Sequence, residues 1–150
     1  MKKNYIFSIA IMLFLLYGCS INSLNISDLE PSNIVADSNN ISITIQEDTI
    51  NSSKEAITLV LQNKTAYEYF YGVDFELEVE SNNQWYKVPF DKNAAFIEIG
   101  LILKANSEST EKIELSKYFS DLPDGKYRIV KTFYLDGKQN LVVGLFNIKK

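Results

Sequence analysis

Hydrophobic and polar residues alternate with a period of two along much of the chain after residue 40. The clearest case is Ile41, Ile43 and Ile45, which are separated by Ser42 and Thr44. The same alternation recurs twice, with apolar positions at Ile57, Leu59, Leu61, Phe75, Leu77 and Val79. Because successive side chains of a strand point to opposite faces, this pattern predicts half-buried antiparallel β-strands.

Turn residues separate the later apolar segments and predict β-hairpins. Asn82-Asn83 follows the strand that contains Val79, and Asp136-Gly137 interrupts an apolar stretch near the end of the chain. Further strands are predicted over residues 84–88, 95–103, 112–115, 126–135 and 140–148. No stretch has a sustained helical period, and only one short helical turn is expected, over residues 115–121. This spacing of about eight short strands is typical of a sandwich or barrel.

The predicted strand over residues 126–135 does not have one clean apolar face. Tyr127, Ile129 and Lys131 fall in the same phase, although lysine is the least suited of them to a core. A β-bulge near Val130 would move Lys131 to the outer face. The sequence leaves this choice open.

The N-terminal segment has the features of a bacterial lipoprotein signal. Lys2-Lys3 precedes an apolar run of 11 residues, from Ile6 to Leu16, which ends at Gly18-Cys19. A spanning helix needs about 20 apolar residues, whereas a signal peptide needs about 7–15. The junction resembles a lipobox, which predicts a signal peptide over residues 1–18 and a diacylglycerol group on Cys19. A plain secretory signal or a short core helix is the alternative.

Residues 19–40 differ in composition from the rest of the chain. They are rich in Ser, Asn and Asp, contain Pro31, and show no apolar period. This composition predicts a flexible tether of ~20 residues, with a root-mean-square span of roughly 25 Å, between the lipid and a domain at 41–149.

Charge and composition exclude several classes of function. Removal of Lys2 and Lys3 would leave 13 basic and 19 acidic residues, a net charge of −6, which disfavours nucleic acid as a partner. The chain has no histidine, and Cys19 is its single cysteine. Histidine-dependent acid–base chemistry and Cys-His or Ser-His dyads are therefore excluded. We expect no cofactor, no metal and no enzymatic activity.

Two sets of polar side chains are candidates for binding. Glu76, Glu78 and Glu80 share one strand face, which is either solvated or a surface for a cation or basic partner. A basic group, formed by Lys126, Arg128 and Lys131, is expected to be a solvated face.

Aromatic side chains form the other candidate surface. Tyr67, Tyr69 and Tyr71 alternate along one segment and are either core residues or an exposed aromatic row. Trp85 is expected in the core, which places Tyr86 on the opposite face. The predicted binding surface therefore consists of these three tyrosines and Tyr86.

Three segments together resemble bacterial immunoglobulin-like domains found as lipoproteins or secreted proteins in Firmicutes. They are Trp85–Pro89, Leu122–Val130 and Phe146–Ile148. The resemblance implies an all-β, immunoglobulin-like antiparallel sandwich of about 7–8 strands. It also implies a tyrosine corner, in which the Tyr127 hydroxyl bonds to the backbone a few residues upstream. The family supplies no catalytic residues.

These observations predict a lipid-anchored, non-enzymatic module on the extracytoplasmic face of the cell membrane. It would bind an unknown protein or form part of the envelope. One alternative is a module that binds a glycan or cell-wall polymer through the tyrosines. Another is a secreted proteinase inhibitor, which would need an exposed, rigid loop, and the segment Asp91–Ala94 is the candidate for it.

Overall fold

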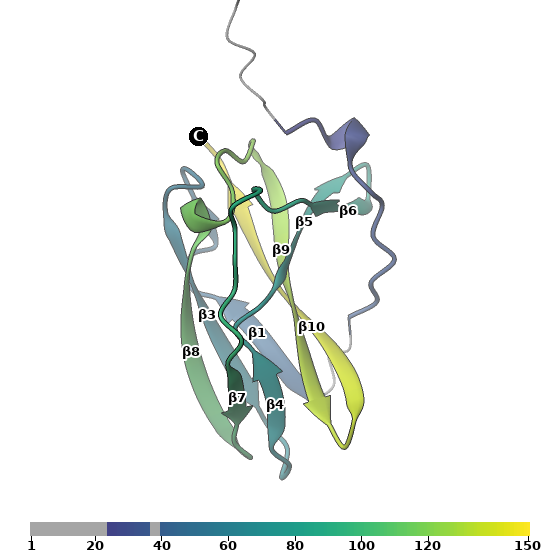
Figure 1. Ribbon diagram of the computed structural model, residues 1–150, viewed down its shortest axis with the longest axis vertical. Helices are drawn as coiled ribbons and strands as arrows, with labels where there is room; N and C mark the ends of the chain where they lie inside the picture. Colours follow the sequence, from purple (N-terminus) through teal and green to yellow (C-terminus); the bar gives the residue numbers. More distant parts are fainter. Residues whose placement is uncertain (1–23, 37–39) are drawn as a thin grey trace, which may run out of the picture.

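A computed structural model describes residues 24–36 and 40–150, which form two β-sheets packed face to face (Figure 1). The smaller sheet has the order β1–β3–β8, with strands Ile41–Ile45, Ala56–Asn63 and Ser107–Glu114. The larger sheet has the order β2–β10–β9–β4–β7, with strands Thr49–Ile50, Lys138–Ile148, Gly125–Leu135, Tyr69–Gly72 and Gly100–Leu103. In addition, β5 (Glu76–Ser81) pairs with β9, and β6 (Gln84–Val88) pairs with β5. The predicted all-β sandwich is confirmed.

Two ends of the sandwich can be distinguished in Figure 1. The upper end carries the 3₁₀ turn η1 (Ile26–Asp28), β6 and the C-terminus. The lower end carries β7 and the turn between β9 and β10. A second 3₁₀ turn, η2 (Leu115–Lys117), occupies the place where a short helical turn was predicted.

No helix within residues 24–36 and 40–150 is long and apolar enough to cross a membrane.

The predicted alternation decides which side chains fill the space between the sheets. The burial pattern of β1 is strictly alternating, and Ile43 faces Leu61 of β3 in the register. Both predicted hairpin turns are present, with positive φ at Asn82, Asn83, Asp136 and Gly137. The predicted strand over 95–103 is shorter than expected, and the one at 112–115 is longer.

The tyrosine corner is present. The Tyr127 hydroxyl donates a hydrogen bond to the Pro123 carbonyl at 2.7 Å, and the ring stacks on Phe146. Burial, together with the nearby Asp121 and Asp124 carboxylates, raises the pKa of Tyr127 above its ordinary value. The side chain is therefore a neutral donor that fixes the chain entering β9.

The inner face of β9 includes Lys131, and no bulge displaces it. Pairing between β9 and β10 is continuous from Gly125 to Leu135. The irregularity lies in the partner strand, because Tyr71 of β4 pairs with Phe133 whereas Glu76 of β5 pairs with Val130. Four residues, 72–75, thus stand opposite residues 131 and 132.

The Lys131 ammonium supplies hydrogen-bond donors to backbone carbonyls where the pairing between strands is interrupted. Its Nζ donates to the carbonyls of Gly72 at 2.9 Å and Asp74 at 3.2 Å. It also pairs with the Glu111 carboxylate of β8, in the opposite sheet, at 3.0 Å. Since Lys131 is only 1 % exposed, the expected solvated face at this residue is wrong.

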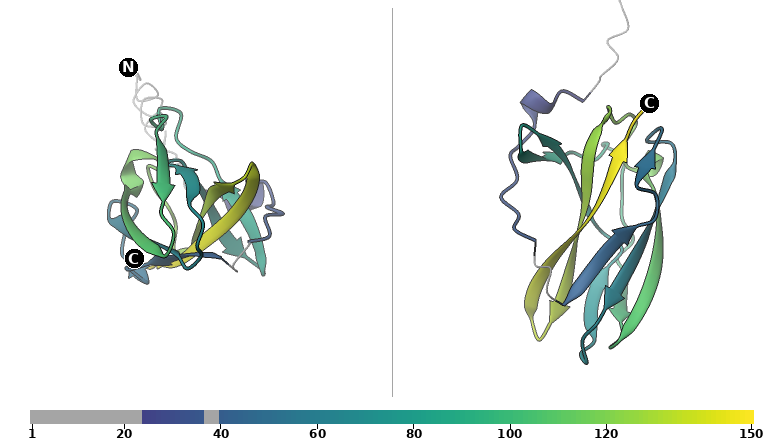
Figure 2. Two further views of the ribbon diagram at one scale, coloured as in Figure 1. Left: turned by 90° about the horizontal axis from the view of Figure 1, so that it is seen from below. Right: turned by 180° about the vertical axis from the view of Figure 1, so that it is seen from behind.

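The segment between residues 24 and 34 lies against the domain, so the predicted flexible tether is wrong for this part. The Ser32 amide donates to the Trp85 carbonyl at 2.8 Å, and the Lys87 amide donates to the Glu30 carbonyl at 2.9 Å. Figures 1 and 2 show the segment descending along the side of the sandwich from the upper end. Its apolar residues Leu24, Ile26 and Leu29 pack against the core. The predicted signal peptide and Cys19 lie outside the described residues.

Candidate functional site

The four tyrosines proposed as a binding surface do not share one face. Tyr69 and Tyr71 are 1 % and 5 % exposed, because alternation along β4 turns both toward the core. The Tyr71 ring packs on Phe133 at a centroid distance of 5.0 Å. Tyr86 lies opposite Val79 and packs against the core, while Tyr67 is exposed. The exposed aromatic row is therefore wrong, and Tyr69 and Tyr71 follow the other alternative, which is packing in the core.

Trp85 is not the core residue that was expected. It lies on the outer face of β6, where the Arg128 guanidinium stacks 4.5 Å from its ring centroid and the Lys126 ammonium lies at 5.6 Å. The assignments of Trp85 and Tyr86 to the two faces are thus reversed. The cations of β9 make the outer face favourable for the indole, because they interact with its electron-rich ring.

Among the glutamates of β5, only Glu76 keeps a largely solvated side chain, at 52 % exposed, and each of the three pairs with a basic side chain. Glu78 is fully buried and accepts a hydrogen bond from Arg128 Nε. Two further pairs are Lys126–Glu80 at 2.8 Å and Lys87–Glu76 at 3.9 Å. Within the described part of the chain, no cluster of three or more acidic, histidine or cysteine side chains could hold a metal.

A row of exposed apolar side chains crosses the outer face of the larger sheet near its lower end. Phe70 of β4 lies between Ile102 of β7 and Tyr134 of β9 in the register. Their exposed fractions are 57 %, 49 % and 40 %. We call these three residues the apolar row. Isolated exposed apolar residues are ordinary, but three neighbours across three strands form a patch of the kind used for binding.

The strand that ends this row has an open edge. Among the described strands, β7 pairs only with β4, and its residues Gly100–Leu103 carry no charge. The edge strand β8 of the smaller sheet, by contrast, presents Glu108, Lys112 and Glu114 to solvent. Charged side chains normally protect sheet edges from pairing with another chain. This protection is present on β8 and missing on β7.

The approach to β7 combines apolar and acidic groups. A cavity of about 390 Å³ lies there, lined by Phe96, Ile97, Glu98, Ile99, Gly100 and Asp74. Ile97 and Ile99 are exposed. The carboxylates of Asp74 and Glu98 thus border an apolar surface that continues into the open edge.

Asn63 holds both sides of this surface in place. It is buried at the end of β3, and its Nδ2 donates to the carbonyls of Tyr67 at 2.7 Å and Lys104 at 2.8 Å. These carbonyls lie just before β4 and just after β7. The surface is therefore anchored to the opposite sheet at its lower end.

Sequence reasoning missed this surface, although Phe70 lies in the opposite phase to Tyr69 and Tyr71. Since both phases of β4 are aromatic, alternation could not decide which aromatic side chains face solvent. The apolar stretch over 95–103 was similarly compatible with burial. It is exposed at Ile97, Ile99 and Ile102, because no element within residues 24–36 and 40–150 covers these side chains.

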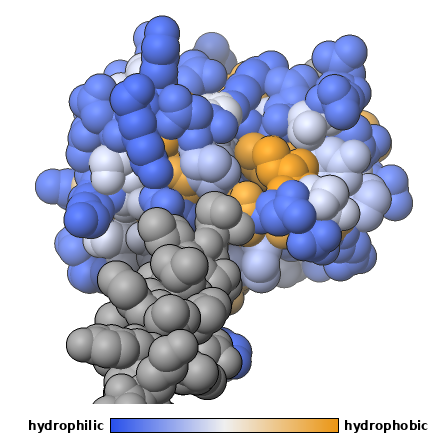
Figure 3. All heavy atoms as spheres, turned by 90° about the horizontal axis from the view of Figure 1, so that it is seen from above, coloured by the Kyte–Doolittle hydropathy of each residue, from blue (hydrophilic) through white to orange (hydrophobic). Residues whose placement is uncertain are grey.

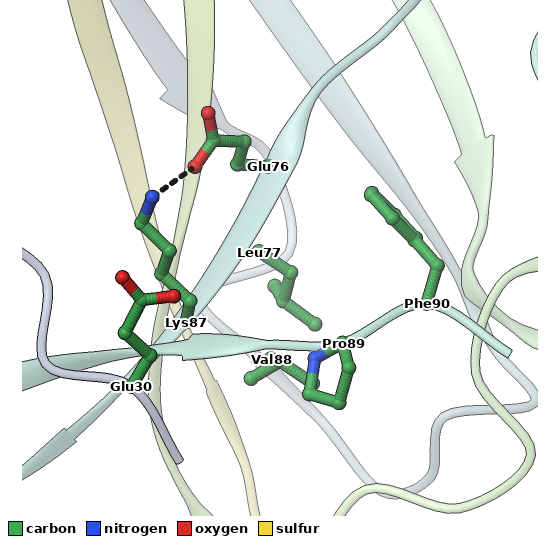
Figure 4. Close-up of a pocket in the computed structure, with 7 residues that line it drawn as sticks. All are labelled: Glu30, Glu76, Leu77, Lys87, Val88, Pro89 and Phe90. Carbon is green, nitrogen blue, oxygen red and sulfur yellow. Dashed lines mark ion pairs between the residues drawn. The ribbon is translucent and has the colours of Figure 1, made fainter.

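Two cavities lie near the upper end. The first, of about 360 Å³, has an apolar lining that includes Leu77, Val88 and Phe90 (Figure 4). Glu30 and the Glu76–Lys87 ion pair border it. The second, of about 290 Å³, shares residues 88–90 and is also lined by Leu24 and Leu122. A mainly apolar lining beside a paired charge can hold an apolar group but supplies no activated nucleophile.

The segment Asp91–Ala94 is a compact turn. The Ala94 amide donates to the Asp91 carbonyl at 2.9 Å, and the Asp91 amide donates to the Tyr118 carbonyl at 2.9 Å. The turn is largely exposed and fixed in place. An inhibitory loop that imitates a substrate is extended instead, since an extended chain pairs with a protease cleft. The geometry does not favour the inhibitor alternative.

Comparison with known protein families identifies a match over most of the sandwich. The family model of the bacterial Ig-like domain matches residues 37–144, which is more than two thirds of the chain. No curated protein matches the sequence. The match covers β1 to β9 completely and ends within β10.

Proposed function

Because the chain belongs to the bacterial Ig-like domain family, we propose that it is a non-enzymatic surface module that binds a protein partner. Cys19 carries its lipid anchor. The open edge of β7 and the apolar row form the binding surface. The observation that supports this site most strongly is the absence of charge on β7, in contrast to β8.

The chemistry of the surface indicates the kind of partner. An open edge offers unpaired backbone donors and acceptors, which suit an extended segment that adds a strand to the sheet. The apolar row would receive apolar side chains of that segment. The carboxylates of Asp74 and Glu98 favour a basic residue beside them. We therefore propose an extended, apolar segment with a basic flank as the partner's contribution.

Other functions have less support. A glycan platform would need several exposed aromatic rings, but Tyr69 and Tyr71 are buried. Members of this family are typically non-catalytic. Action by contact agrees with a chain that contains no histidine and whose single cysteine is the proposed lipid site.

Photo-crosslinking in intact cells tests the binding surface. With p-benzoylphenylalanine in place of Phe70 in the full-length protein, we expect a discrete adduct with one partner. The same probe in place of Thr110, on the charged edge of β8, serves as the matched control and should give no such adduct. Adding Ile102→Lys should reduce the Phe70 adduct at least about tenfold, because loss of an interface anchor costs about 2 kcal/mol or more.

Two results would refute this surface. One is the absence of any adduct at Phe70. The other is an adduct that persists at full yield after Ile102→Lys, because a strand paired at β7 would not tolerate a lysine in the apolar row.

Fractionation of cells tests the anchor. We expect Cys19→Ala to move the protein from the membrane pellet to the soluble fraction, because the thiol that carries the lipid is lost. Ser23→Ala, four residues away, should leave the protein in the pellet. Retention of Cys19→Ala in the membrane would show that the lipid is not the anchor.

A further inference from the structure

We infer that the docked N-terminal segment determines which end of the domain faces the membrane. The upper end rests on the lipid surface, and the apolar row at the lower end points away from it. This inference rests on the proposed lipid at Cys19. It deepens that proposal, because it assigns a second contact surface with a lipid bilayer as its partner.

The length of chain between Cys19 and the domain differs between the two possible attachment points. Leu24 follows Cys19 by five residues, so a fully extended chain lets it move at most ~17 Å from the lipidated residue. Ile41, which begins β1, follows Cys19 by 22 residues. If residues 24–36 were free, the domain would be attached at Ile41, with a long and permissive tether. When they are docked, the attachment point moves to Leu24.

Docking of the segment changes which end of the domain is attached close to the lipid. The chain enters the sandwich near its lower end, where β1 begins, whereas the docked segment carries the attachment point to the upper end (Figures 1 and 2). The strand β10 alone has 11 residues and spans ~36 Å along the domain. That length exceeds the reach of the chain between Cys19 and Leu24, so the lower end cannot come as close to the lipidated residue as the upper end.

The docking contacts involve backbone and buried side chains. Two bonds join Glu30 and Ser32 to the edge of β6. Gln84 Nε2 donates to the Ser32 carbonyl at 2.9 Å, and Arg128 Nη2 donates to the Ile34 carbonyl at 3.2 Å. Ser32 itself is buried. A segment held by four such bonds and by apolar side chains acts as part of the domain.

The upper end has an apolar surface suited to a bilayer. Figure 3 shows hydrophobic side chains gathered on this end, between polar ones. The second cavity opens there, with Leu24, Pro89 and Phe90 among its lining residues. The acidic Asp121 at its border pairs with Lys150 at 2.7 Å, which reduces its repulsion of anionic lipid. Because the mature chain is acidic, the short connection and apolar contact would hold this end, not attraction between opposite charges.

Energy transfer from single labels tests the orientation. The full-length protein is purified with Lys92→Cys or Lys138→Cys, and Cys19 does not react because it is acylated. Each labelled protein is reconstituted in phosphatidylethanolamine–phosphatidylglycerol vesicles that carry an acceptor on the lipid headgroups. We expect transfer from position 92, at the upper end, to exceed that from position 138 at least about twofold, given the span of the sandwich.

Release of the docked segment provides the matched comparison. Leu29→Asp removes an apolar contact, and Ser32→Pro removes the amide that donates to the Trp85 carbonyl. With both substitutions, the ratio of transfer at position 92 to that at position 138 should fall to one or below. Equal transfer at the two positions in the parent, or an unchanged ratio after release, would overturn the inference.

Failure of the anchor can be recognised separately, because an unlipidated protein would not float with the vesicles. In that case a hexahistidine tag replaces Cys19, and nickel-chelating lipid is included in the vesicles. The ratio of the two positions then tests the orientation set by docking without the acyl group. A ratio above about two supports the inference, and a ratio of one refutes it.

Discussion

Lys131→Met is expected to lower the free energy of unfolding by about 3–5 kcal/mol, the range for breaking a buried ion pair from one side. The ammonium joins the carbonyls of Gly72 and Asp74 to the Glu111 carboxylate of the other sheet. Methionine fills a similar volume, but it leaves these three acceptors without their donor. Urea denaturation monitored by tryptophan fluorescence measures the change.

Two control variants separate the buried charge from the loss of packing. Lys126→Met makes the same change on the same strand, but Lys126 pairs with Glu80 near the surface, so the expected cost is about 0–1 kcal/mol. The double variant Lys131→Met/Glu111→Met should recover much of the stability, because no carboxylate is then left unpaired. A loss of under about 1 kcal/mol for Lys131→Met would show that Glu111 and the carbonyls find solvent instead.

Arg128→Met should have a comparable effect, again about 3–5 kcal/mol, because Glu78 has no exposed surface and would lose the cation that pairs with it. Two further interactions are lost in the same variant. Arg128 stacks on Trp85 and donates to the Ile34 carbonyl of the docked segment. Denaturation should therefore be accompanied by faster thermolysin cleavage between residues 24 and 36 in the native state.

The double variant Glu78→Met/Arg128→Met distinguishes these two roles. It removes the unpaired carboxylate and should restore most of the stability. It still lacks the bond to Ile34, so cleavage between residues 24 and 36 should remain faster than in the parent. Restored stability with parental cleavage would show that Arg128 does not hold the segment, and unrestored stability would contradict the ion-pair argument.

Both residues show why the candidate site was only partly predictable. Alternation placed Glu78 on the outer face of its strand, and this placement is confirmed, but it left open which face Lys131 takes. Burial was not predictable, because it depends on what lies across from each side chain. Lys131 donates to carbonyls within residues 72–75, which connect β4 to β5 and carry two more residues than the part of β9 opposite them. The segment that contacts Arg128 comes from about 90 residues earlier in the chain.

The exposure of the binding surface, like the burial of these charged residues, could not be predicted from alternation alone. Tyr69 and Phe70 are neighbours with similar side chains, so the sequence predicts that they face opposite sides without deciding which side is covered. The core lies on the tyrosine side because β8 and β3 cover it there. Phe70 remains exposed because no described element packs over the row formed with Ile102 and Tyr134.

By itself, the sequence determined most of the strands, two hairpin turns and the sandwich class, because these depend on local periodicity and on residues close in the chain. The tyrosine corner was implied by the resemblance to a known family. The short apolar run before Cys19 likewise predicts a lipid anchor from local composition alone. Tertiary structure decided the buried ion pairs, the exchange of faces between Trp85 and Tyr86, and the docking of residues 24–34. Each of these depends on pairing between distant segments. The alternation within a strand divides its side chains between two faces. Only the packing of the second sheet and of the N-terminal segment determines which face loses its contact with water.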